Sequence, residues 1–313
     1  MSGAPYGGAD PGLYGPASVT WQCHGEPVMW IAGVRALYLQ ALHPRAVRGV
    51  MENSDFRSDA WGRLLRTADF VGTLTYGTTE AAERAGARVR AIHRTLSATD
   101  PDTGERFPVD DPALLLWIHC AQIDSFLHVL RRSGVPLTRD QADRYVDENR
   151  TGARLVGLDP RDVPADTAQL AGYFETVRSQ LTAGPDARAV DAFLRSPPTH
   201  PLLVPGRNLL WRPIARLAYA TLPDWAHRMY GRPAPAPRDT TRRLRLTGHA
   251  LRTIPAALRW QLPPGHILKA MRRMGPGSRP SPYTLRTSAA ILDGPGRARH
   301  DDGGGFTTWR SPD

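Results

Sequence analysis

The sequence has few cysteines, few lysines and no long uninterrupted hydrophobic run, and each shortage excludes a class of protein. Its two cysteines, Cys23 and Cys120, are too few for a disulfide framework and lack the spacing of a zinc site. No run of 18 apolar residues predicts a membrane span, and no basic, apolar and small-residue succession predicts a signal peptide. We therefore expect a cytoplasmic protein in a reducing compartment.

The charge of the chain is basic, and very few of the basic residues are lysine. The sequence has 40 Lys+Arg against 30 Asp+Glu, which gives a formal net charge of +10. Such a balance can indicate an anionic partner, but a GC-rich genome also encodes an excess of Arg, Ala, Gly and Pro. We expect no specific nucleic-acid binding, and only weak attraction of the basic C-terminal region to anionic surfaces.

Helical periodicity is the main structural signal. Hydrophobic residues make up 41% of the 313 positions, which is enough for a sizeable core. No strand alternation is convincing, so the predicted fold class is all-α, a single helical bundle-like domain. The expected helices include residues 28–42, 80–96, 111–130, 138–156, 166–181 and 186–194.

Composition divides the chain into four parts. Residues 1–18 are rich in Gly and Pro and predict a flexible leader, and residues 19–235 predict the helical domain. Residues 236–274 form an Arg-rich, amphipathic helical extension. Residues 275–313 offer little periodic apolar surface and predict a disordered tail.

Two neighbouring helices place polar groups on their apolar faces. Helical spacing puts Arg63 and Thr67 in line with Val71, and it puts His93 four residues after Val89 on the next helix. A guanidinium on a buried face needs an anion. An imidazole there is either a hydrogen-bonded core residue or a metal ligand, and the spacing alone leaves both open.

Two further histidines are candidate site residues. His119 lies on an apolar helical face with the same geometry as His93 and is its rival. His43 follows a helix and either caps its C-terminus or reaches a pocket. Non-haem iron held by these three histidines with Glu26 or Asp111 is an alternative, although no 2-His-1-carboxylate spacing stands out.

Four motifs carry a resemblance to a known family. They are Gln40-Ala41-Leu42-His43-Pro44, Arg63-Leu64-Leu65-Arg66-Thr67, Val89-Arg90-Ala91-Ile92-His93 and Asp111-Pro112-Ala113-Leu114-Leu115-Leu116-Trp117-Ile118-His119. Together they resemble the rubber-oxygenase (latex-clearing-protein) and MpaB-type oxygenase family over residues 25–235. The resemblance implies an all-helical domain that binds haem b in a pocket between helices. It also implies an oxidoreductase that oxidises or cleaves an apolar substrate with dioxygen.

Within that resemblance, three residues bind the cofactor. His93 is the expected axial ligand of the haem iron, and His119 is the rival ligand. The other imidazole nitrogen of His93 should bond to a carbonyl or carboxylate. Arg63 is expected to hold a haem propionate, because guanidinium and carboxylate can pair through two parallel hydrogen bonds.

The resemblance also places Arg66, Thr67 and His43 around the oxygen-binding side as catalytic residues. In the rubber-cleaving enzymes the position that matches Arg66 is a lysine, which can ligate iron when it is neutral. Arginine stays protonated and cannot do so. We therefore expect Arg66 to stabilise bound dioxygen electrostatically.

The expected partners follow from this chemistry. They are a hydrophobic small-molecule or polymer substrate and dioxygen, with the need for an electron donor left open. Two other classes of function stay open: a non-catalytic haem- or lipid-binding helical protein, and a basic protein that binds DNA or a membrane surface.

Overall fold

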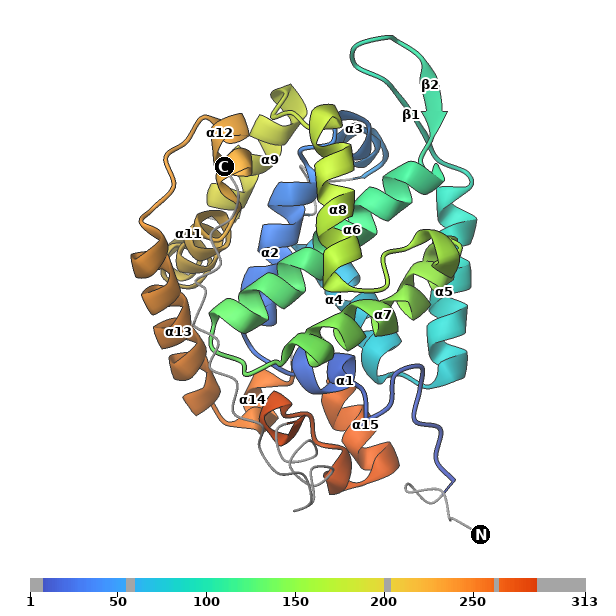
Figure 1. The fold of residues 1–313 in the computed structure, drawn as a ribbon, viewed down its shortest axis with the longest axis vertical. Helices are drawn as coiled ribbons and strands as arrows, with labels where there is room; N and C mark the ends of the chain where they lie inside the picture. The colour runs from blue at the N-terminus through green and yellow to red at the C-terminus, as the bar shows by residue number, and fades with distance from the viewer. Residues whose placement is uncertain (1–7, 55–59, 200–203, 262–264, 286–313) are drawn as a thin grey trace, which may run out of the picture.

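The computed structural model describes residues 8–54, 60–199, 204–261 and 265–285, and in these the chain is mostly helical. The predicted all-α fold is confirmed (Figure 1). In chain order the helices are α1 Val19–His24, α2 Met29–Gln40, α3 Pro44–Asn53, α4 Ala60–Tyr76, α5 Thr79–His93, α6 Pro112–Arg132, α7 Arg139–Val156, α8 Thr167–Val177, α9 Pro185–Arg195, α10 Val204–Gly206, α11 Arg212–Ala220, α12 Asp224–Tyr230, α13 Pro237–Thr253, α14 Ala256–Arg259 and α15 His266–Met274. Shorter turns are η1 Pro160–Asp162, η2 Arg178–Gln180, η4 Arg207–Trp211, η5 Pro276–Ser278 and η6 Pro282–Thr284.

Local capping signals explain where several helices begin and end. The Thr138 hydroxyl accepts from the Gln141 N–H at 3.1 Å, and the Gln141 side chain accepts from the Thr138 N–H at 3.0 Å. This reciprocal pair satisfies two donors that the first turn of α7 leaves free. The helix ends at Gly157, whose φ of +109° suits a residue without a side chain. Observed and predicted limits of α7 therefore agree within one residue.

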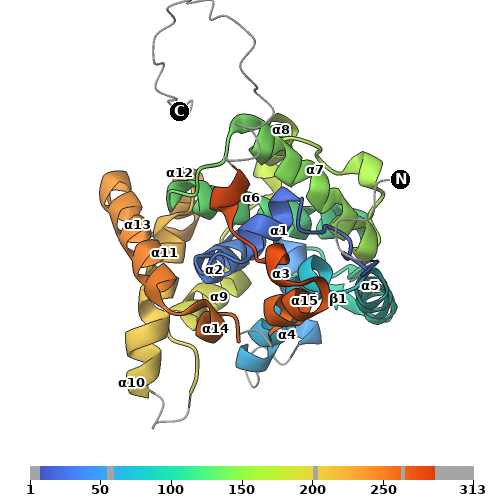
Figure 2. The same cartoon turned by 90° about the horizontal axis from the view of Figure 1, so that it is seen from below.

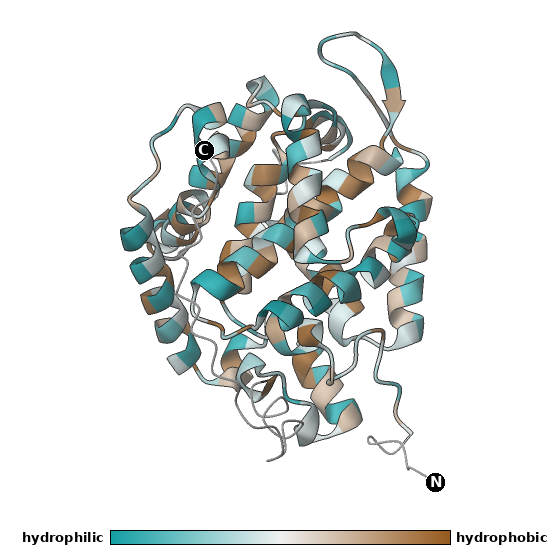
Figure 3. Cartoon of the chain, viewed as in Figure 1, coloured by the Kyte–Doolittle hydropathy of each residue, from teal (hydrophilic) through white to brown (hydrophobic). Residues whose placement is uncertain are grey.

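Helices α2 and α6 pack together at the centre of the domain, and hydrophobic residues are concentrated along them (Figure 3). In the described residues, α6 is a helix long and apolar enough to cross a membrane, although no such run was expected from the sequence. However, 61% of its apolar window is buried inside the protein. Core helices of soluble proteins can have the same length and composition as a membrane span. The packing of α6 against α2 therefore explains its apolar sequence.

A small hairpin is the structural element that the sequence did not predict. Strands β1 Ser97–Thr99 and β2 Arg106–Pro108 pair antiparallel, with Ala98 opposite Phe107. Both of these side chains are buried. Three residues per strand are too few to show alternation, which is why periodicity missed the pair.

The chain after α13 packs back onto the first helices. Trp21 and Trp260 belong to a separate apolar cluster, and the Trp21 indole donates to the carbonyl of Ser278 at 2.9 Å. Figure 2 shows α15 beside α4. Residues 275–285 are therefore packed, whereas the sequence assigned them to a disordered tail. The remainder of that predicted tail lies outside the described residues.

The predicted leader is also held in place over the part that the structure describes. Both oxygens of the Asp10 carboxylate accept hydrogen bonds from Thr79 at the start of α5, at 2.7 and 2.9 Å. Ser18 caps α1 by accepting from the Trp21 N–H. Composition alone missed this order, because it arises from contacts with residues far along the sequence.

Candidate functional site

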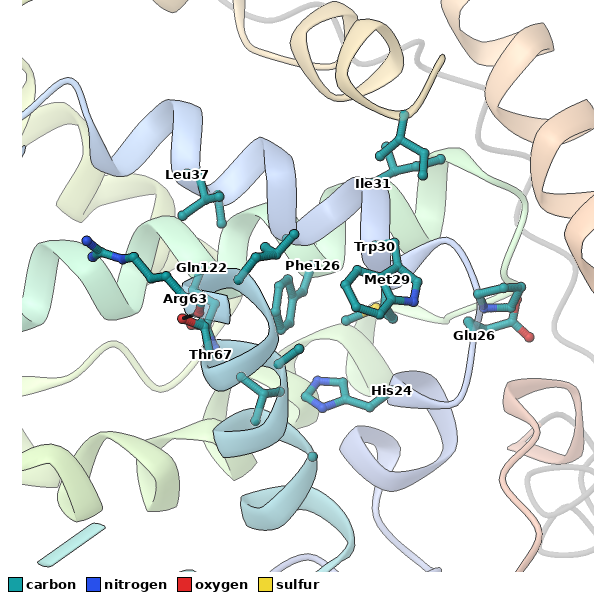
Figure 4. Close-up of a pocket in the computed structure, with 18 of the residues that line it drawn as sticks. His24, Glu26, Met29, Trp30, Ile31, Leu37, Arg63, Thr67, Gln122 and Phe126 are labelled. Atoms are coloured by element: carbon teal, nitrogen blue, oxygen red, sulfur yellow. Dashed lines mark hydrogen bonds between the residues drawn. The ribbon is translucent and has the colours of Figure 1, made fainter. Parts of the chain in front are cut away.

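A cavity of about 490 Å³ lies between α2, α4 and the segment that follows α13. Its walls are mostly apolar and come from α2, α4, α6, α9, α11 and residues 251–267. Figure 4 shows several of these side chains, among them Met29, Leu37 and Phe126. The size and lining are those of a site for an apolar small molecule. We call it the large cavity.

Arg63 and Thr67, one turn apart on α4, both lie on the wall of the large cavity (Figure 4). The Thr67 hydroxyl donates to the carbonyl of Arg63 at 3.1 Å, and the Arg63 guanidinium donates to the hydroxyl of Ser54. Burial lowers the pKa of Arg63, and the nearby positive charge of Arg66 acts in the same direction. An anion in the cavity would offset this cost of burying the charge.

Arg66 is exposed and is not among the residues that line the cavity. It directly precedes Thr67, so it lies about 100° around the helix from that residue, because one turn takes 3.6 residues. The structure thus brings Arg63 and Thr67 together and leaves Arg66 outside.

A second cavity of about 110 Å³ adjoins the first, and we call it the small cavity. Three histidines line it: His24 from α1, His93 from α5 and His119 from α6. Five residues line both cavities and therefore form a common wall. They are His24, Val71, Thr75, Ile118 and Gln122.

His93 is the last residue of α5 and has a buried ring nitrogen without a partner. Its Nδ1 is inaccessible to solvent and makes no hydrogen bond within the described parts of the chain. The expected carbonyl or carboxylate partner is therefore not found there. Burial lowers the pKa of His93, which favours the neutral imidazole that a metal requires.

His119 lines the same small cavity from α6. Burial lowers the pKa of His119 to about 4, so its imidazole is neutral at pH 7. A neutral imidazole facing a cavity is a competent axial ligand. Geometry alone therefore keeps His119 as a rival to His93.

His24 was not identified from the sequence, yet it lies in the wall between the two cavities. The Thr75 hydroxyl donates to the carbonyl of Val71 at 2.9 Å, so it must accept from Nδ1 of His24, also at 2.9 Å. Nε2 of His24 then accepts from the hydroxyl of Tyr145 at 2.8 Å. Burial lowers the pKa of His24 to about 3. Both ring nitrogens are occupied, so His24 is not a free metal ligand.

His43 takes a structural position that neither sequence interpretation described. Its Nδ1 accepts from the Ala46 N–H at 3.4 Å and caps the start of α3, whereas α2 ends at Gln40 and its C-cap is Ala41. The ring is buried 6.3 Å from that of Trp117 and is not among the residues lining either cavity. The prediction that His43 caps the C-terminus of the preceding helix is therefore wrong, while its catalytic role stays a prediction.

The side chains around the cavities can be compared with what a bare metal ion and a haem each require. Across the described segments, no group of three or more His, Cys, Asp or Glu side chains could share a metal. Of the carboxylates proposed for non-haem iron, Glu26 pairs with Arg252 and Asp111 caps α6. A haem needs only one imidazole and partners for its propionates. The unpaired nitrogen of His93 and the half-buried charge of Arg63 fit those needs.

Comparison with known protein families gives a match over most of the chain. A family model described as "ER-bound oxygenase mpaB/B'/Rubber oxygenase, catalytic domain" matches residues 21–253. No curated protein and no solved structure matches the chain. The matched range contains every candidate residue described above. It ends before the residues that complete the wall of the large cavity, namely Ile254, Leu258, Arg259, Trp260, His266 and Ile267.

Proposed function

The chain belongs to the mpaB/rubber oxygenase catalytic-domain family, and on this basis we propose that it is a haem b-dependent oxygenase that oxidises or cleaves an apolar substrate with dioxygen. One observation carries the cofactor. It is the unpaired, buried Nδ1 of His93 in a small cavity that shares a wall with a large apolar cavity.

Residues of the two cavities would bind different parts of the haem. His93 would hold the iron from the small cavity, and Arg63 would neutralise a propionate from the large one. Haem b would supply the activation of dioxygen. The hydroxyl of Thr67 can turn from the Arg63 carbonyl to donate a hydrogen bond into the cavity.

The apolar lining of the large cavity defines what the substrate can be. Side chains such as Met29, Leu37 and Phe126 offer no charge and few hydrogen bonds, so they favour a hydrocarbon. The oxygen-uptake experiment below, done with and without a reductant, tests whether the reaction needs an external electron donor.

The first experiment is spectroscopic. Protein expressed with adequate iron is expected to show a Soret band and about one haem per chain. Oxygen uptake is then measured with a long-chain alkene, with and without a reductant. Colourless, iron-free protein that also fails to take up added hemin would contradict the proposal. Haem-loaded protein that consumes no oxygen under either condition would favour a non-catalytic haem-binding protein.

A matched pair of variants tests the oxygen-binding side. Thr67→Val removes a hydroxyl from the cavity wall, so we expect the Soret band to persist while the rate of reaction with dioxygen falls by about tenfold or more. Arg66→Ala, on the outside of the same helical turn, should change that rate much less. Equal effects of the two variants would contradict the placement of Thr67 at the reacting centre.

A further inference from the structure

One end of the large cavity is built outside the family-matched range and carries positive charge. Leu258, Arg259 and Trp260 line this end, next to Glu26 of the segment before α2. The Trp260 indole donates to the carbonyl of Gly25 at 3.1 Å, which ties α14 to that segment. This end is therefore a feature added to the family domain by the residues after α13.

The carboxylate at this end is already neutralised. Glu26 is 6% exposed and accepts from Nε of Arg252 at 2.7 Å. The negative charge of Glu26 also acts on Arg259, but one carboxylate balances only one of the positive charges gathered at this end. Any further arginine nearby is therefore in excess.

Two such arginines flank the ring of Trp260. The guanidinium of Arg259 lies 5.4 Å from the ring centroid, and that of Arg279 lies 5.5 Å from it. Neither forms an ion pair with a carboxylate in the part of the chain that the structure describes. The Nε of Arg259 and one terminal nitrogen of Arg252 are buried without a hydrogen-bond partner there. Burial lowers the pKa of Arg259, and the charges of Arg279 and Arg252 act in the same direction, whereas the negative charge of Glu26 opposes them.

The local excess extends through the sequence around it. Residues 204–285 contain 15 Arg or Lys residues and two acidic residues, so the remainder of this basic chain is slightly acidic. Positive charge is therefore concentrated in the part of the chain that includes the segment closing the cavity. A fixed patch of one sign beside an apolar cavity attracts the opposite charge.

The cavity opens to solvent at the same place. Ile254 and Leu258 line the cavity and are also 40% and 65% exposed, and Leu258 directly precedes Arg259. In Figure 4, Glu26 marks this end, and Arg63 with Thr67 lies on the opposite side. Apolar side chains such as Met29 and Trp30 lie between the two ends.

We propose that this end recognises the anionic head group of a single-chain amphiphile, with a long-chain carboxylate as the form that fits best. The head group would pair with Arg259 and Arg279 at the mouth, and the apolar chain would lie in the large cavity and extend toward Thr67. Arginine suits a carboxylate because its planar fork can donate two parallel hydrogen bonds. The inference names the substrate class of the proposed oxygenase and rests on that function.

The test compares two probes of nearly equal shape on the full-length protein. Oleate and oleyl alcohol are titrated against the fluorescence of the tryptophans or against a bound fluorescent fatty acid. We expect oleate to bind about tenfold more tightly, which corresponds to one charge-assisted pair. Arg259→Gln should remove most of that preference while leaving the affinity for oleyl alcohol unchanged. Arg279→Gln should act in the same direction, and Arg272→Gln, an exposed arginine on α15, is the matched control.

Three outcomes would overturn the proposal. The first is equal affinity for oleate and oleyl alcohol in the unaltered protein. The second is an Arg259→Gln variant that loses its Soret band but keeps its oleate preference, because the arginine would then serve a haem propionate. The third is Arg259-dependent binding to anionic phosphatidylglycerol vesicles without binding of free oleate. Since ligand titration and the Soret band are separate readouts, failure here is distinguishable from failure of the haem assignment.

Discussion

The two cavities share a wall but differ in what lines them and in where their residues come from. Three histidines from α1, α5 and α6 face the small cavity, all within the family-matched residues 21–253. The large cavity is apolar and needs residues 254–267 to complete it. Under the proposed function, the residues that bind the cofactor would belong to the shared domain, whereas the shape of the substrate site would depend on the segment that follows it.

The largest expected effect separates the two candidate ligands of the small cavity. His93→Ala should lower haem occupancy by at least about tenfold, because it removes the axial bond. His119→Ala should cost mainly packing, about 1–3 kcal/mol, with the Soret band retained. Haem content per chain and urea unfolding measure the two effects. An empty His119→Ala protein beside a fully loaded His93→Ala protein would move the ligand to α6.

The next effect concerns closure of the large cavity. Trp260 is 5% exposed and packs in the cluster that contains Trp21 and Tyr76. Trp260→Ala should lower the free energy of unfolding by about 3–5 kcal/mol. The matched control is Ile92→Ala on α5, where the side chain is 48% exposed and the change should stay within about 0.5 kcal/mol. Similar losses for both variants would show that residues after α13 do not stabilise the domain.

The free energy of unfolding should fall below neutral pH because His24 and His119, which line the small cavity, are buried as neutral imidazoles. The folded-state pKa is about 3 for His24 and about 4 for His119, each depressed by burial from an ordinary value of 6.5. Between pH 6.5 and 4 the unfolded chain therefore binds protons that the folded chain does not. Each histidine should lower the free energy of unfolding by up to about 1.4 kcal/mol per pH unit as pH falls through this window.

Urea unfolding at several pH values measures this slope. A variant carrying His24→Gln and His119→Gln should have a flatter profile, because neither glutamine titrates. An unchanged profile in the double variant would mean that other groups cause the acid sensitivity.

The smallest expected effect concerns the hydrogen bond between Tyr145 and His24, which lies in the wall shared by the two cavities. Tyr145→Phe removes the hydroxyl that donates to Nε2 of His24, so it leaves a buried acceptor unpaired. The expected cost is about 1–3 kcal/mol of unfolding free energy. Tyr283→Phe, at an exposed tyrosine of η6, should cost almost nothing. If both variants unfold at the same urea concentration as the unaltered protein, the hydrogen bond at His24 contributes nothing to stability.

Much of the fold was predictable because it depends on local signals. Helices such as α7 begin at a capping box and end at a glycine, and both features can be identified in a few residues of sequence. The hairpin and the packing of residues 275–285 depend on contacts between distant segments. Periodicity within a window of one helix contains no information about such contacts.

The site divides in the same way. The apolar face of α4 correctly indicated that Arg63 and Thr67 share a wall, because both lie on one helix. His24 was missed because α1 has only six residues, too few to show a stripe that an inward histidine interrupts. Arg66 and His43 were grouped with the cavity by motif alone, and the structure places both outside its lining.

The packing of Trp21 against the end of the described chain has a consequence for the order of folding. The partners of its indole and of the Trp260 indole, Ser278 and Gly25, lie more than 200 residues away in sequence. During synthesis the family-matched residues leave the ribosome before these contacts can form, because domains begin to fold from the N-terminal side. The large cavity therefore lacks its final wall for the last part of translation.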